Sequence, residues 1–124
     1  PPPPSPIAVS CMPASVTGAA PGFYYTIGGS TSAQTVGANT YTISGIPSNH
    51  PMRLVQRSGG CNPSFVSASN SINTGGYYGA SYWYYGTVTY SLAGCAAGSV
   101  AQFQCGYHGL MNGGQPYLQV DSAC

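Results

Sequence analysis

Apolar and polar residues alternate along several short stretches of this chain. Between Thr87 and Leu92 every second residue is apolar, and Ala101, Phe103 and Cys105 fall on one side of another stretch. A period of two is typical of a β-strand with one buried face, and clusters of Gly, Pro, Asn and Ser separate these stretches. The pattern predicts strands near residues 7–11, 22–28, 33–36, 39–45, 51–57, 81–92, 99–105 and 116–121.

No stretch after residue 6 has the period of an amphipathic helix, so the strands predict an all-β sandwich or barrel. We expect one domain over residues 7–124, in which residues 58–80 form a long loop. Residues 1–6 are Pro-Pro-Pro-Pro-Ser-Pro. This composition favours polyproline II structure, and we interpret the segment as a Pro-rich linker or arm.

The chain is almost without charge. Only Arg53, Arg57 and Asp121 are charged, which is 2% of the residues, whereas globular domains average about 25%. Two cations are too few for a nucleic-acid binder, and one acidic residue cannot form the carboxylate pair of a glycosidase. Because no run approaches the roughly 20 apolar residues of a membrane helix, we also expect no membrane span.

The cysteine content indicates an oxidising compartment. Five cysteines in a short chain rich in Tyr, Ser, Thr and Gly favour a secreted or cell-surface location. The chain has no initial Met and no signal-type apolar stretch, so we interpret it as a mature or excised domain. Since five is odd, one cysteine is left without a disulfide partner.

A candidate metal site begins at one of these cysteines. Cys105 opens the loop Cys-Gly-Tyr-His-Gly-Leu-Met, which also holds His108 and Met111. Thiolate, imidazole and thioether together select copper, and one Cys, two His and a weak axial Met form the type 1 ligand set. The only other histidine is His50, which we expect to point inward at the start of the strand near 51–57.

These features resemble the cupredoxin (type 1 blue copper) family, with a ligand loop similar to that of plastocyanin and amicyanin. The matching pieces are His50, the strand Phe-Gln-Cys ending at Cys105, the Cys-x-x-His-x-x-Met loop, and a closing strand within 113–120. The resemblance covers roughly residues 22–121. It implies a Greek-key β-sandwich of about eight strands that transfers one electron and is not an enzyme on its own.

The resemblance also implies a role for each ligand. His50, Cys105 and His108 would be equatorial ligands of one copper ion, Met111 the axial ligand, and His108 the ligand that reaches the surface. Two neighbours depart from the family pattern. Pro51 has no N–H to donate to the sulfur, where many relatives have Asn, and Tyr107 keeps an N–H where others have Pro. We therefore expect the sulfur to receive its hydrogen bond from the opposite side.

With Cys105 assigned to the metal, four cysteines remain for two disulfides. Four cysteines allow three pairings. We favour Cys61 with Cys95, which would tie the long loop to the strand near 99–105, and Cys11 with Cys124, which would join the two ends.

The sequence leaves three functions open. The first is an extracellular one-electron carrier with an unidentified redox partner. The second is a structural module of an extracellular fibre, wall or appendage, with copper incidental or absent; it would self-associate through the Pro-rich arm and exposed aromatics. Residues 75–86 hold six aromatic side chains, of which strand alternation exposes either Tyr82 and Tyr84 or Trp83 and Tyr85. The third, copper storage, is disfavoured because the chain has only two His and three Met.

Overall fold

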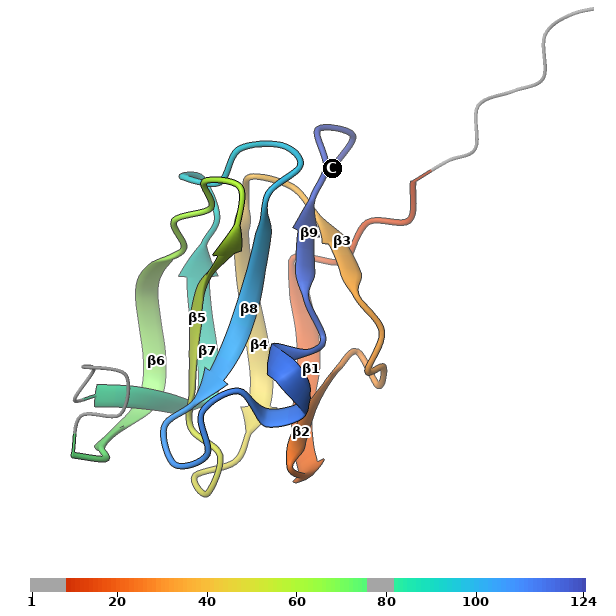
Figure 1. Cartoon of the computed structure of the whole chain (residues 1–124). Helices are drawn as coiled ribbons and strands as arrows, with labels where there is room; N and C mark the ends of the chain where they lie inside the picture. Colours follow the sequence, from red (N-terminus) through yellow and green to blue (C-terminus); the bar gives the residue numbers. More distant parts are fainter. Residues whose placement is uncertain (1–8, 76–81) are drawn as a thin grey trace, which may run out of the picture.

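The computed structural model describes residues 9–75 and 82–124 as an all-β domain. One mixed sheet of nine strands curls into a half-barrel (Figure 1). The sheet order is β2-β1-β4-β7-β5-β8-β9-β3, and β6 pairs with β7 off this path. The strands are β1 (Ser15–Gly22), β2 (Tyr24–Ile27), β3 (Gln34–Val36), β4 (Thr40–Ile46), β5 (Met52–Ser58), β6 (Ser64–Asn73), β7 (Tyr82–Ser91), β8 (Val100–Cys105) and β9 (Leu118–Val120).

The alternating stretches place the core inside the curled sheet. In β8 the apolar residues Ala101, Phe103 and Cys105 are buried, while Gln102 and Gln104 between them are partly exposed. Burying a large apolar side chain stabilises a fold by about 1.5–3 kcal/mol. The same alternation in β4 and β7 therefore fixes which face of each strand lines the core.

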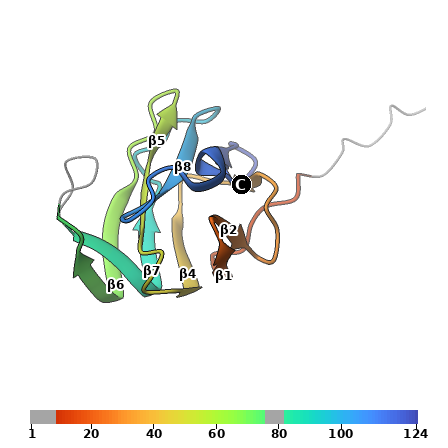
Figure 2. The same cartoon turned by 60° about the horizontal axis from the view of Figure 1, so that its bottom comes forward.

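The prediction of a long loop over 58–80 is wrong, because Ser64–Asn73 forms strand β6. This strand pairs with β7 from Ser64↔Ser91 to Asn73↔Tyr82. It lies at one side of the molecule with most of its residues exposed (Figures 1 and 2). A strand that is held by its backbone ladder rather than by a buried face leaves no apolar alternation in the sequence.

Two further expectations about strands need correction. Strand β1 is absent from the predicted strands, because its small residues do not alternate; Gly18 lets it pack closely on β4, where a Cβ would lie 2.8 Å from Ile43 Cγ2. Of the strand expected at 7–11, residues 7 and 8 lie outside the described residues. In the described part only Cys11 pairs, in an isolated parallel bridge to Thr35.

Two disulfides join Cys61 to Cys95 and Cys11 to Cys124, the pairs that the sequence favoured, and they fit an oxidising compartment. Cys105 is a buried free thiol. The Pro-rich arm and residues 76–81 of the aromatic segment lie outside the described residues. No helix in residues 9–75 or 82–124 has the length and apolar character needed to cross a membrane.

Candidate metal centre

Antiparallel pairing of β5 with β8 brings the two distant parts of the site together. Met52 pairs with Cys105, the last residue of β8. His50 lies two residues before Met52, in a turn where its N–H bonds Pro47 O at 3.2 Å. The register of one strand pair therefore places the histidine beside a cysteine 55 residues further along the chain.

The loop after Cys105 turns back at once and brings its histidine to the cysteine. Cys105 N donates to Gly109 O at 2.7 Å, and Gly109 N donates to Cys105 O at 2.9 Å. This pair of hydrogen bonds closes a tight turn in which Gly109 has a φ of 70°, in the left-handed region that favours glycine. His108 thus faces the thiol instead of pointing away along the strand.

Three donor atoms form a small triangle. Cys105 Sγ lies 3.7 Å from His50 Nδ1 and 3.6 Å from His108 Nδ1, and the two Nδ1 atoms are 3.2 Å apart. The centre of this triangle is about 2.0 Å from each atom, close to the metal–ligand bond lengths of about 2.0–2.1 Å for nitrogen and 2.3 Å for sulfur in zinc sites. The residues present therefore fit a metal ion.

The four residues of the site differ in their exposure to solvent. Cys105 and Met111 are buried, and His50 is only 6% exposed, whereas His108 is exposed. Met111 opens the short 3-10 segment η2 (Met111–Gly114), directly after the loop. The site is thus a cluster of two histidines, one cysteine and one methionine, in which one histidine lies at the surface.

A buried tyrosine holds the His50 turn in place. The Tyr25 hydroxyl donates to His50 O at 2.8 Å and lies 3.3 Å from Pro51 O. Gly106 N donates to Pro51 O at 2.9 Å, which links the turn to the cysteine loop as well. Sequence patterns did not identify Tyr25, because its role depends on contacts 25 residues away in sequence.

Burial keeps His50 in the protonation state that can bind a metal. Burial, followed by the nearby His108, lowers the pKa of His50 below its ordinary value of 6.5, which favours the neutral imidazole that a metal binds. Burial also raises the pKa of Tyr25, and the Cys105 thiol beside it raises it further. The tyrosine therefore remains a neutral hydrogen-bond donor.

Exposed aromatic side chains lie beside the exposed histidine. The Phe23 ring stands edge-on to His108, with the ring centroids 4.8 Å apart, and is 69% exposed. Tyr107 and Leu110 are exposed on the same loop. No local sequence motif ties Phe23 to the site, because this residue belongs to the connection between β1 and β2.

The sulfur lies within 3.7 Å of both imidazoles and also interacts with the Tyr25 hydroxyl. Pro51 is buried and contributes only its carbonyl to the network around the site. The hydrogen bond to the sulfur that we expect from the side opposite Pro51, where Tyr107 keeps its N–H, stays a prediction.

Comparison with protein families, with curated proteins and with solved structures found no match to this chain. The chemistry of the centre therefore rests on its own donor set. Two imidazole nitrogens, a thiol and a neighbouring thioether within this all-β fold resemble a type 1 copper site.

Proposed function

We propose that this domain is a cupredoxin-like, extracellular copper protein that carries one electron at a time. The observation that carries the proposal is the triangle of Cys105 Sγ and two Nδ1 atoms, with no side longer than 3.7 Å. Met111 would supply the weak fourth ligand expected of a type 1 centre. A Greek-key sandwich order for the strands is part of this proposal.

The donor set favours copper over zinc. Structural zinc sites use four strong nitrogen or sulfur ligands in a tetrahedron. Here the described residues supply three such ligands and a thioether, which is a soft and weak donor suited to copper. When bound, copper would supply reversible one-electron chemistry between its two oxidation states.

The chain's own part is to keep the ligands still while the charge on the site changes. Cys105 ends a paired strand, and the His50 turn is fixed by Tyr25 and by Gly106 N. A fixed site needs little rearrangement when an electron arrives or leaves. His108 offers the short route to a partner, because it is the ligand exposed at the surface.

We propose no enzymatic activity for the domain alone. Catalytic metal sites keep a coordination position open for water or substrate, and four ligands would fill this one. The redox partner is an unidentified protein. Two arginines and one aspartate cannot create a strong steering field, so the partner would dock through apolar contact or be tethered.

The test is spectroscopic. Purified protein loaded with Cu(II) should show the intense visible absorption of a thiolate-to-copper transition, and ascorbate should bleach it reversibly. Cys105→Ser should abolish the band. Copper-loaded wild type that remains colourless would contradict the proposal.

A matched pair of methionines tests the axial ligand. Met111 and Met12 are buried to the same degree, 4% and 5% exposed, so both substitutions by leucine should cost similar stability. Only Met111→Leu should change the spectrum and the reduction potential. Equal spectra for the two variants would remove Met111 from the ligand set.

A second candidate function is a structural module of an extracellular assembly. Specific support comes from β6, which exposes the Phe65 ring at the side of the sheet. Chains that associate without copper and lack the visible band when loaded would favour this function over electron transfer.

A further inference from the structure

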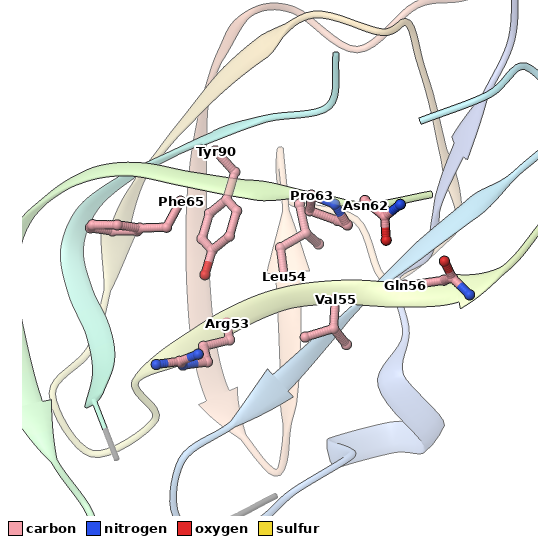
Figure 3. Close-up of a pocket in the computed structure, with 8 residues that line it drawn as sticks. All are labelled: Arg53, Leu54, Val55, Gln56, Asn62, Pro63, Phe65 and Tyr90. Atoms are coloured by element: carbon pink, nitrogen blue, oxygen red, sulfur yellow. The ribbon is translucent and has the colours of Figure 1, made fainter. Parts of the chain in front are cut away.

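A groove of about 310 Å³ opens on the side of the molecule between β5 and β6. Figure 3 shows Arg53 and Phe65 at one end of it, Gln56 and Asn62 at the other, and Tyr90 between the two strands. We call this feature the β5–β6 groove. Leu54, Val55 and Pro63 complete its lining.

The topology of the sheet creates the groove. Strand β7 pairs with β6 along most of its length but with β5 only at Met52↔Tyr84. Beyond that point β5 pairs with β8 through its other edge. In the described part of the chain no ladder joins β5 to β6, and side chains line the space between the two strands.

Aromatic rings form one wall of the groove. Phe65 stacks on Tyr84 with centroids 3.8 Å apart and an interplanar angle of 12°, and meets Tyr90 edge-on at 5.8 Å. Stacking fixes the Phe65 ring, although the residue is 41% exposed. A rigid, exposed ring of this kind makes a good anchor for a partner because little side-chain entropy is lost on binding.

The polar groups of the groove can all donate hydrogen bonds. Arg53 is held by a bond from Nε to Tyr82 O and lies over the Tyr84 ring at 5.6 Å. Guanidinium groups only donate, and the amides of Gln56 and Asn62 each carry two donor hydrogens. The groove thus combines flat apolar rings with donors and contains no carboxylate.

We propose that the β5–β6 groove binds the Pro-rich segment, residues 1–6, of a second copy of this chain. Proline residues have carbonyl acceptors and apolar rings but no N–H, which complements a groove of rings and donors. Proline-rich segments dock in aromatic-lined grooves because their polyproline II form is already ordered. Five of the six residues of this segment are proline.

The segment is too short to reach the groove of its own chain. Cys11 pairs with Thr35 in β3, and β3 and β6 lie on opposite sides of the molecule (Figures 1 and 2). The ten residues that precede Cys11 span about 31 Å in polyproline II form. A surface path between opposite sides of a domain this size, with a radius of gyration of about 14 Å, exceeds about 40 Å.

This contact joins two different surfaces, the arm of one copy and the groove of the next. Such head-to-tail contacts close into a ring or continue as an open chain. The association does not involve the metal centre. It is therefore measured on metal-free Cys105→Ser protein, so that its outcome is independent of the copper proposal.

Sedimentation across a hundredfold range of concentration tests the proposal on the full chain. The average mass should rise with concentration. Phe65→Ser should weaken association at least tenfold, as expected for an aromatic anchor, and replacing Pro2, Pro3 and Pro4 by serine should do the same. Val66→Ser is the matched control, because Val66 is 53% exposed on the same strand and does not line the groove.

Mixing the two defective variants gives a sharper result. The Phe65→Ser chain keeps its arm and the proline-substituted chain keeps its groove, so the mixture should form dimers and nothing longer. A chain that stays monomeric at all concentrations overturns the proposal, as does a Phe65→Ser variant that associates like Val66→Ser. Circular dichroism checks that all variants fold.

Discussion

Removing the buried hydroxyl of Tyr25 should weaken the hydrogen bonding that holds the His50 turn at the metal centre. It should leave no cavity in the apolar core. In Tyr25→Phe the ring remains packed near Phe103, whose centroid is 5.7 Å away. The variant loses the hydroxyl that donates to His50 O at 2.8 Å. Pro51 O keeps its bond from Gly106 N at 2.9 Å, so the affected group is the His50 carbonyl.

The expected cost follows from that single unsatisfied carbonyl. Leaving a buried acceptor without its donor costs about 1–3 kcal/mol. Unfolding entropy of about 2.1 cal/mol/K per residue gives about 0.26 kcal/mol/K for a chain of this length, so the melting temperature should fall by about 4–12 °C. The His50 turn should also move more freely, because its main tether to the core is gone.

The assay is thermal and denaturant unfolding of metal-free protein, followed by copper titration. Tyr117→Phe is the control, since its hydroxyl also donates to a carbonyl, Gly113 O at 3.0 Å, but at the surface. Surface substitutions usually change stability by no more than about 0.5 kcal/mol. If Tyr25→Phe is no less stable than Tyr117→Phe, the hydroxyl does not hold the His50 turn and the reasoning fails.

Three other predictions follow from the packing, the cross-links and the charges. Gly106→Ala should lower the free energy of unfolding in urea by about 1–3 kcal/mol, because the added Cβ would lie 2.6 Å from Trp83 Cγ in the core. Gly22→Ala should lower it less, because its Cβ would meet only an exposed tyrosine ring at 3.1 Å. Cys11→Ala opens a disulfide between residues 113 positions apart and should cost up to about 5 kcal/mol in the same assay. The pKa of His50 is lower in the folded chain than in the unfolded chain, so the unfolded chain takes up a proton first as the pH falls. The free energy of unfolding of the metal-free protein should therefore decrease below pH 6.5, by at most about 1.4 kcal/mol per pH unit. Stability that is flat or rises over that range would contradict the burial of a neutral His50.

The sequence identified the four residues of the candidate metal centre but not their surroundings. Cys105, His108 and Met111 lie within seven residues, so their chemistry can be read from local spacing. His50 could be added because it is the only other histidine. Tyr25 and Phe23 could not, because their contacts with the site depend on how β2 and its preceding turn lie against the His50 turn.

The strands divide in the same way. Those with one buried face, such as β4, β7 and β8, carry an alternation that predicts them. The sequence pattern did not predict β6, because most residues on both of its faces are exposed. It did not predict β1 either, because the small residues of that strand pack by close approach. Backbone pairing and close contact leave little trace in the order of side chains.

The sequence by itself thus determined an all-β class, a soft metal-ligand set and a nearly uncharged surface, since each follows from local period, composition or spacing. Only the tertiary structure decided that the three donor atoms meet within 3.7 Å, that the Phe23 ring lies against His108, and that a groove separates β5 from β6. The physical reason is that strand register is a long-range property. It is set by cooperative burial over the whole sheet, and it brings together residues that no local pattern connects.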